Sequence, residues 1–215
     1  MKNLLIIGAG GMGREVAWLV ERINKQNSIW NIIGFIDDSI EKKDKILNGY
    51  KVIGGLDTIA KYPDAYLVCA VGASKTRKSI VDKIHERFPD SEYATLIDPS
   101  VEMSDKNIIG EGSIICAHSI LTVNIDIGKH VIVNMDCTIG HDAVLNSFVM
   151  VYPGVNISGN TNIGTCTELG TGMQIIQGKK IGDYSIVGAG SVVIKDIPEN
   201  CTAVGCPAKP IKFFE

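Results

Sequence analysis

The chain contains four histidines, and one of them has neighbours suited to proton transfer. Histidine has an ordinary pKa near neutrality, which makes it the first candidate for a general base. His141 alone stands between a corner glycine and a carboxylate, Asp142, whose charge would favour the imidazolium. The alternative for Asp142 is a solvated corner residue. His85 falls in a helical pattern, where we expect a solvated surface group, and His118 and His130 fall at outward or corner positions of a repeat.

The repeat that contains His141 has a period of six residues. Aliphatic side chains recur at every sixth position from Ile109 to Val193, without an insertion or a miss, and Ile97 and Met103 keep the same phase. This period suits neither an α-helix nor a single strand. It fits coils of three short strands, with one aliphatic residue per strand pointing to a common axis. We therefore predict a three-sided prism of stacked parallel strands, with eighteen residues in each coil.

Small residues occur at fixed positions of this repeat. A glycine often follows the inward aliphatic residue, as at Gly110, Gly128 and Gly140. Corners of a narrow coil need either a positive φ or close clearance, and glycine supplies both. Four positions after the aliphatic residue the side chain is often small, as at Ser113 and Ala143, which would let the prism close. Burial of the aliphatic side chains would give this half of the chain its own core.

Gly159 has a defined relation to the candidate base. It lies eighteen residues after His141, and therefore one coil further along the same edge. Neighbouring coils are spaced like neighbouring strands, about 4.8 Å apart, so the backbone N–H of Gly159 could approach a reacting carbonyl. The alternative is an ordinary corner glycine.

The first ninety residues alternate strand and helix patterns. The apolar run Lys2–Ile7 precedes a glycine turn and a helical pattern that continues to Ile23. Asn31–Ile36 and Ala65–Val71 predict two more strands, and residues 75–88 predict a second helix. Strands that alternate with helices imply a small parallel sheet, which binds ligands at the carboxyl ends of its strands. We predict a first domain over residues 1–93 and a coiled domain, closed by a C-terminal cap, over residues 94–215.

The glycine turn allows more than one interpretation. A strand, a glycine-rich turn and a helix place backbone amides where they can hold a phosphate group. Gly8, Gly10 and Gly13, followed by the pair Asp37 and Asp38, also match a dinucleotide fingerprint. A domain of about ninety residues is half the size of a full dinucleotide fold, so one nucleotide or a nucleotide-sugar is favoured. The alternative is that the glycines only permit a tight turn.

Composition argues against several classes of function. The 215 residues carry a net charge of −3, and no run of Lys or Arg suggests a nucleic-acid surface. The start of the chain lacks the features of a secretory signal, and no stretch approaches the apolar length of a membrane span. The six cysteines are scattered without a CxxC pair. We therefore expect a cytoplasmic protein with reduced thiols and no metal site.

Together these motifs resemble the bacterial sugar acetyltransferases of the hexapeptide-repeat superfamily. The narrower resemblance is to the nucleotide-aminosugar N-acetyltransferases, which are grouped with the sialic acid O-acetyltransferases. It rests on the glycine turn, the strand end Gly34–Asp38, Gly72 after a third strand, hexads with Gly-His-Asp at 140–142, and the tail Gly205–Lys209. It implies an α/β Rossmann-like subdomain followed by an all-β left-handed parallel β-helix. It also implies a homotrimer that binds acetyl-CoA in the grooves between neighbouring β-helices.

The resemblance assigns catalytic roles to four residues. His141 matches the family's catalytic base, and Asp142 matches the carboxylate that raises the basicity of that base. Gly159 matches a candidate oxyanion donor, and Asn134 matches a position close to the reacting centre. No Ser or Cys nucleophile with a placed base is evident, so we expect direct transfer without a covalent acetyl-enzyme.

The resemblance also implies contacts with both substrates. Met150, Thr171 and Ala189 fall where relatives contact acetyl-CoA. Relatives often carry a histidine at the position of Met150, whose thioether can line the pantetheine path but cannot donate a hydrogen bond. The residues that match the family's nucleotide-sugar contacts are Gly10, Gly11, Met12, Asp37, Asp38 and Gly72.

The implied function is acetyl-CoA-dependent N-acetylation of a nucleotide-linked amino sugar, in particular a 4-amino-4,6-dideoxy sugar, with His141 as the base. Three alternatives stay open. One is O-acetylation of a sialic acid or a similar hydroxyl acceptor by the same histidine. Another is a non-catalytic β-helix that binds nucleotide-sugars. The third is an NAD-linked oxidoreductase, which only the glycine spacing favours.

Overall fold

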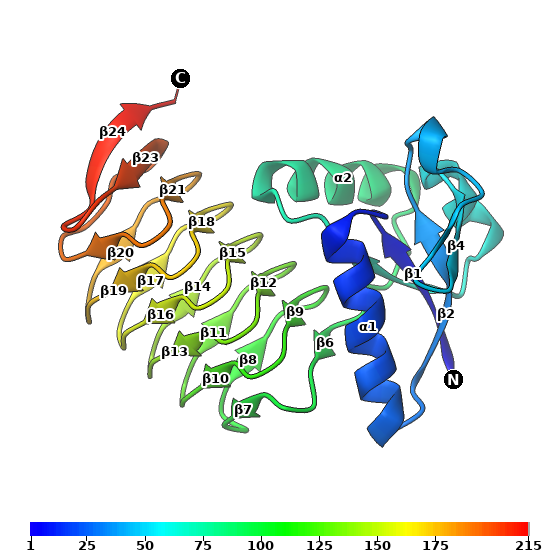
Figure 1. The fold of residues 1–215 in the computed structure, drawn as a ribbon, viewed down its shortest axis with the longest axis horizontal. Helices are drawn as coiled ribbons and strands as arrows, with labels where there is room; N and C mark the ends of the chain where they lie inside the picture. The colour runs from blue at the N-terminus through cyan, green and yellow to red at the C-terminus, as the bar shows by residue number, and fades with distance from the viewer. Residues whose placement is uncertain (215) are drawn as a thin grey trace.

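The computed structural model describes residues 1–214, which form an α/β head and a β-helix that extends from it (Figure 1). The sheet of the head has the strand order β3-β4-β2-β1-β5. Its strands are β1 (Lys2–Ile7), β2 (Trp30–Ile36), β3 (Ile46–Leu47), β4 (Tyr50–Gly54) and β5 (Tyr66–Cys69). The helices are α1 (Gly11–Gln26) and α2 (Ser74–Arg87), with the 3-10 turns η1 (Ile40–Lys42) and η2 (Leu56–Lys61).

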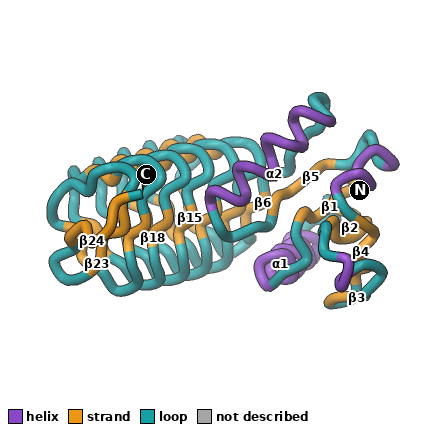
Figure 2. Tube along the Cα trace, turned by 90° about the horizontal axis from the view of Figure 1, so that it is seen from above, coloured by secondary structure: helices purple, strands orange, loops and turns teal. Residues whose placement is uncertain are grey.

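The two helices cover opposite faces of this sheet (Figure 2). Alternate residues of β1 point to opposite sides, so Leu4 and Ile6 join the core under α1, whereas Leu5 and Ile7 join the core under α2. The three predicted strands and both predicted helices are present. The antiparallel hairpin of β3 and β4 was not predicted, because strands this short show no clear alternation. No helix in the described part of the chain is long and apolar enough to cross a membrane.

The β-helix has the predicted period. Each coil strand is two residues long and pairs in parallel with the strand eighteen residues later, as Ile120 does with Thr138. The β6 face contains β6 (Leu96–Ile97), β9 (Ile114–Ile115), β12 (Ile132–Val133), β15 (Met150–Val151), β18 (Glu168–Leu169) and β21 (Ile186–Val187). The β7 face contains β7 (Glu102–Met103), β10 (Ile120–Leu121), β13 (Thr138–Ile139), β16 (Asn156–Ile157), β19 (Gln174–Ile175) and β22 (Val192–Val193). The β8 face contains β8 (Ile108–Ile109), β11 (Asp126–Ile127), β14 (Val144–Leu145), β17 (Asn162–Ile163) and β20 (Lys180–Ile181).

Three edges join these faces, and they are numbered by the face that precedes each of them in the chain. The first edge follows the strands of the β6 face, the second edge follows those of the β7 face, and the third edge follows those of the β8 face. Residues at equivalent positions of one edge are eighteen residues apart.

The interior of the prism holds the aliphatic repeat. From Ile115 to Val193 every sixth residue is at most 2% exposed. The earlier members of the repeat are only partly buried, because they lie at the open end of the first coil. At the other end, β23 (Cys201–Val204) extends the β6 face and β24 (Lys209–Phe213) pairs with it in antiparallel fashion. Ala203 and Ala208 join the interior, so the tail caps the prism as predicted.

The backbone conformation at the corners of the coils differs from the sequence prediction. From Ile109 to Val187 the left-handed conformation occurs three residues after each inward residue, and it includes non-glycine residues such as His118 (φ 60°) and Phe148 (φ 64°). The glycine that directly follows the inward residue has no positive φ. A Cβ on Gly140 would lie 2.6 Å from the backbone nitrogen of Gly159 in the next coil. Of the two explanations for these glycines, close clearance is therefore correct and positive φ is wrong.

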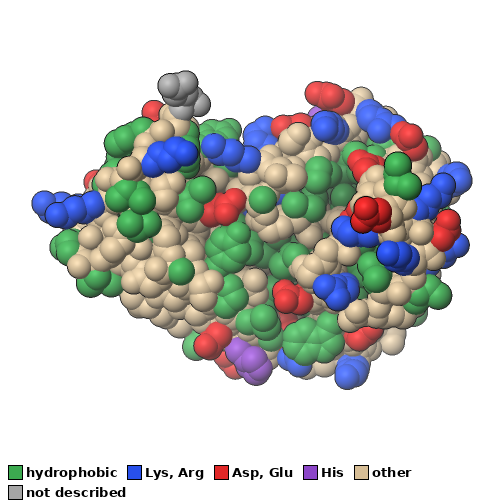
Figure 3. Space-filling view, turned by 45° about the horizontal axis from the view of Figure 1, so that its top comes forward, with side chains coloured by type: hydrophobic (Ala, Val, Ile, Leu, Met, Phe, Trp, Pro, Cys, Tyr) green, Lys and Arg blue, Asp and Glu red, His purple; other side chains and the backbone are tan. Residues whose placement is uncertain are grey.

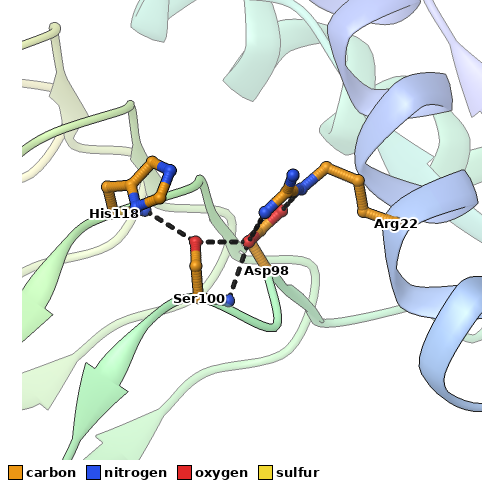
Figure 4. A network of polar contacts seen from close by, with 4 residues as sticks. All are labelled: Arg22, Asp98, Ser100 and His118. Atoms are coloured by element: carbon orange, nitrogen blue, oxygen red, sulfur yellow. Dashed lines mark hydrogen bonds and ion pairs between the residues drawn. The ribbon is translucent and has the colours of Figure 1, made fainter.

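The head sits on the β6 face of the prism. Outward side chains of that face, such as Ile114 and Ile132, share one hydrophobic cluster with α1. Polar contacts also connect α1 to the start of the β-helix (Figure 4). The guanidinium of Arg22 in α1 donates to both oxygens of Asp98, at 2.6 and 3.0 Å, and Ser100 donates to the same carboxylate. Burial acts to raise the pKa of Asp98, but these donors outweigh it and leave the pKa below its usual value.

Candidate active site

His141 lies on the second edge of the prism, directly after β13. Its Nδ1 is 2.7 Å from Oδ2 of Asp142, and both side chains are about half exposed, at 48% and 46%. Successive residues of an extended chain point to opposite sides. Asp142 has a φ of 57°, a left-handed conformation that aspartate tolerates, and its carboxylate contacts the preceding imidazole. The local fold therefore places a carboxylate against Nδ1 and leaves the side chain about half exposed.

Asn124 continues this contact into the preceding coil. It is eighteen residues before Asp142, and its Nδ2 donates to Oδ1 of that carboxylate at 3.3 Å. The hydrogen bond with His141, and then the one with Asn124, hold the pKa of Asp142 below its usual value. An ionised carboxylate can only accept, so Asp142 selects the tautomer that donates a hydrogen bond from Nδ1–H, and Nε2 is then left as the acceptor of the ring. Sequence analysis missed Asn124, although the eighteen-residue spacing could have found it.

Gly159 lies against the imidazole, as its position one coil further along implies. A Cβ on Gly159 would be 2.5 Å from Nε2 of His141, so only a glycine leaves the ring in its observed place. Within residues 1–214 the N–H of Gly159 donates to no protein acceptor, whereas its carbonyl accepts from the N–H of Gly178 at 3.0 Å. The described residues therefore leave this N–H without an acceptor, and its role as an oxyanion donor remains a prediction.

Other predicted residues lie on a different edge. Asn134 belongs to the first edge, where it is 6% exposed and its Oδ1 accepts the N–H of Met135 at 2.8 Å. Thr171 and Ala189 are exposed at equivalent positions of that edge, one coil apart. A single chain therefore does not bring these three residues to His141, which lies on the second edge.

The structure gives no support for the predicted contact of Met150 with acetyl-CoA. Met150 is the outward residue of β15 on the β6 face, and α1 covers this part of the face. Its side chain is 2% exposed and packs in the cluster that joins the head to the β-helix. The position contributes to packing, and it offers no open surface to a pantetheine chain.

The glycine turn of the head faces open space and lies beside the first edge. A Cβ on Gly10 or Gly11 would meet no atom within 4 Å, and no side chain caps the N-terminus of α1. Met12 packs against the same hydrophobic cluster as Met135 and Tyr152 of the first edge. Figure 3 shows charged side chains crowded over the head and a hollowed surface where the head meets the β-helix.

A pocket of about 240 Å³ lies at the carboxyl ends of β1 and β2, and Asp37, Asp38 and Thr76 are among its lining residues. Burial acts to raise the pKa of Asp37, but hydrogen bonds from the Ala9 N–H and from Lys42 outweigh it, so the pKa is lowered. The pocket is otherwise mainly aliphatic. A larger pocket of about 300 Å³, at the far end of α2, includes none of the predicted residues.

Gly72 and Asp38 complete the predicted contacts of the head. A Cβ on Gly72 would meet no atom within 4 Å, and its carbonyl accepts from the guanidinium of Arg77. Asp38 accepts the N–H of Leu56 through Oδ1 at 3.0 Å. The predicted nucleotide-sugar residues therefore gather at the carboxyl edge of the sheet.

The other three histidines have different surroundings. His85 on α2 is exposed as expected, and His118 is exposed on the first edge. His130 on the third edge is only 4% exposed, and its ring lies between Tyr93 and Phe148, with ring centroids 4.6 and 5.1 Å away. Burial lowers the pKa of His130 to about 4. His130 does lie at a corner, as expected, but it is buried because the head covers that corner.

Known proteins share both parts of this fold. Residues 3–84 match the PglD N-terminal domain family. The acetyltransferase domain of PglB from Neisseria gonorrhoeae FA1090, which has also been solved with acetyl coenzyme A, is 33% identical with a TM-score of 0.88. The match covers 98% of this chain and 100% of that one. The chain belongs to the hexapeptide-repeat sugar acetyltransferases. The predicted fold class, a Rossmann-like head followed by a left-handed β-helix, is confirmed.

Two further relatives of this acetyltransferase carry names that describe a substrate. GDP-perosamine N-acetyltransferase of Escherichia coli O157:H7 is 29% identical, over 96% of this chain and 95% of the relative. Perosamine N-acetyltransferase from Caulobacter crescentus was solved as a histidine-to-asparagine variant with CoA and GDP-perosamine. It is 25% identical with a TM-score of 0.89, and the match covers 99% of this chain and 98% of that one.

Proposed function

We propose that this acetyltransferase moves the acetyl group of acetyl-CoA to the amino group of a nucleotide-linked amino sugar. One observation carries the proposal: the half-exposed imidazole of His141 is anchored to Asp142 through Nδ1, and its other nitrogen lies against Gly159. This arrangement suits a general base whose free nitrogen faces a ligand. The names of two relatives that match nearly the whole chain support an amino sugar as the acceptor.

The proposed reaction is a direct transfer. Nε2 of His141 takes a proton from the acceptor amine as its nitrogen attacks the thioester carbonyl. The N–H of Gly159 would stabilise the oxyanion, which collapses as the C–S bond breaks and CoA leaves as a thiol. Asp142 stabilises the imidazolium that forms between these steps.

We also propose that a second copy of the chain completes the site, in a homotrimer. The support is the division between edges: His141 lies on the second edge, whereas Asn134, Thr171 and Ala189 lie on the first edge. In a threefold assembly of parallel prisms, the first edge of each copy can face the second edge of the next. Acetyl-CoA would then lie between Thr171 and Ala189 of one copy and His141 of another.

The head would hold the nucleotide part of the nucleotide-linked amino sugar. Of the residues proposed to contact it, Asp37 and Asp38 line the pocket at the carboxyl edge of the sheet, and Met12 of the glycine turn packs in the same hydrophobic cluster as residues of the first edge. A sugar attached there can extend between two copies towards His141. These contacts are Gly10, Gly11, Met12, Asp37, Asp38 and Gly72. The domain boundary at residue 93 stays a prediction. A cytoplasmic location also stays a prediction, and the six free cysteines are in keeping with it.

A thiol-release assay tests the function. The enzyme is incubated with acetyl-CoA and a panel of nucleotide-linked 4-amino sugars that includes GDP-perosamine, and with free sialic acid. We expect CoA release with at least one amino sugar and none with sialic acid. Release with sialic acid alone would identify an O-acetyltransferase, and failure to bind acetyl-CoA would leave only a nucleotide-sugar-binding protein.

Substitution of the base tests the mechanism. We expect His141→Ala to lower kcat by at least about a hundredfold, the usual contribution of a general base. Size-exclusion chromatography should show the same assembly, because the side chain is about half exposed and contributes little to the core. His118→Ala is the matched control, since His118 is an exposed edge histidine in the same β-helix. Near-normal turnover of His141→Ala would remove this residue from the mechanism.

A further inference from the structure

Arg77 is a fully buried cation that pairs with no carboxylate among residues 1–214. It lies in the first turns of α2 with an exposed fraction of 0%. A guanidinium has five N–H donors, and five backbone carbonyls surround this one. Nε donates to His130 at 3.0 Å, Nη1 donates to Val71 and Gly72 at 2.6 and 2.8 Å, and Nη2 donates to Phe148 and Val149 at 2.8 and 3.1 Å. Burial lowers the pKa of Arg77 to about 10, so the group stays charged at neutral pH.

These five carbonyls come from two separate parts of the molecule. Val71 and Gly72 belong to the loop that leads from β5 to α2 in the head. The other carbonyls belong to two successive corners of the third edge of the β-helix. The guanidinium therefore holds the loop 71–74 against the prism, through groups that every residue type possesses.

Glu168 makes a second connection at the same place. It projects from the β6 face, and its Oε1 accepts the N–H of Ser74 at 2.8 Å, at the start of α2. The N-cap residue of α2 provides no side-chain cap, so a carboxylate from a distant coil satisfies this end of the helix. Oε2 of Glu168 accepts the hydroxyl of Tyr152 on the first edge at 3.2 Å.

We propose that Arg77 and Glu168 are positioning residues for the nucleotide-sugar. Together they fix the loop 71–74, and with it Gly72, relative to the first edge, where the acceptor amine must meet its acetyl donor. The inference rests on the proposed function, because it needs the loop to contact the nucleotide-sugar. Neither residue touches the reacting atoms. A lysine has three donors in place of five and cannot hold both the loop and the two corners.

The test compares Arg77→Lys with the wild-type enzyme in steady-state kinetics. We expect KM for the nucleotide-sugar to rise about tenfold or more, whereas KM for acetyl-CoA and kcat stay within about twofold, because the cation is kept and the second edge is untouched. Arg87→Lys is the matched control, since Arg87 is an exposed arginine in the last turn of the same helix. Equal losses for both substrates, or no change in KM for the nucleotide-sugar, would overturn the proposal.

Glu168→Gln covers the case in which Arg77→Lys does not fold. The amide keeps one acceptor for the N–H of Ser74 but loses the negative charge, so we expect a smaller rise of KM, about threefold, in the same direction. An unchanged KM for the nucleotide-sugar in a folded Glu168→Gln enzyme contradicts the proposal.

Titration of the enzyme with GDP and with UDP, in the absence of acetyl-CoA, measures nucleotide binding to the head separately from acetyl transfer. If the wild-type enzyme releases no thiol with any sugar, the proposed function fails; if it does and the variants match it, only the positioning role fails.

Discussion

His130 makes the stability of this protein depend on pH in a way that one substitution can isolate. Its ring is buried between Tyr93 and Phe148, where burial lowers the pKa to about 4 from an ordinary value of 6.5. His130→Phe removes the titrating group. A phenylalanine suits the corner, because Phe148 occupies the equivalent position one coil later with the same left-handed backbone, at φ 64°.

The sign and size of the effect follow from these two pKa values. The folded state keeps the ring neutral, whereas the unfolded state protonates it below about pH 6.5, so unfolding takes up a proton. The free energy of unfolding therefore falls as the pH falls through this window, and the loss is complete below about pH 4. At 1.36 kcal/mol per pKa unit the full loss is about 3 kcal/mol, and about 2 kcal/mol of it occurs between pH 7 and pH 5.

Urea unfolding at one protein concentration, at pH 7, 6 and 5, measures this loss. We expect wild-type protein to lose about 2 kcal/mol more than His130→Phe over that range. Any packing cost of the larger ring shifts all three values of the variant equally and leaves the difference unaffected. His118→Phe is the matched control, because His118 is an exposed histidine with a similar φ of 60°. Parallel pH profiles for the wild type and His130→Phe would refute the argument.

Two other substitutions test glycine positions. Gly159→Ala should lower kcat about tenfold or more with little effect on urea unfolding, because a Cβ 2.5 Å from Nε2 must displace the exposed ring of His141. Gly13→Ala should destabilise the protein by about 2 kcal/mol or more in the same unfolding assay, since a Cβ there would lie 2.0 Å from a backbone oxygen. Gly10→Ala, with nothing within 4 Å, should unfold like the wild type. Normal turnover of Gly159→Ala or normal stability of Gly13→Ala would contradict these contacts.

The β-helix could be predicted because every coil repeats one geometry. The inward position of each strand must be aliphatic, so the period is visible in the sequence without knowledge of the contacts, and it aligns His141 with Gly159. The left-handed corners could not be located in this way. Their positions are occupied by glycine, asparagine and aspartate, but also by residues such as Phe148 and Tyr184. At those corners the coil geometry overrides the local preference of the side chain.

The contacts between the head and the prism had no sequence signal. Arg77 binds only backbone carbonyls, which any residue supplies, and the acceptors on the prism lie more than fifty residues away. Burial of Met150 and His130 has the same cause, because the head covers their positions only in the folded chain. Residue types and spacing therefore predicted each part of the molecule better than they predicted how the parts meet.

Changes of chain length are tolerated very unequally in this molecule. From β6 to β22, paired residues of the β-helix are eighteen positions apart. Deletion of one residue between His141 and Gly159 would place Asn160 against the imidazole and turn every later aliphatic side chain out of the interior. A segment inserted at an edge, in contrast, can leave and return without moving a strand. New surface loops, and with them new ligand contacts, can therefore be added to this enzyme at its edges but not within its two-residue strands.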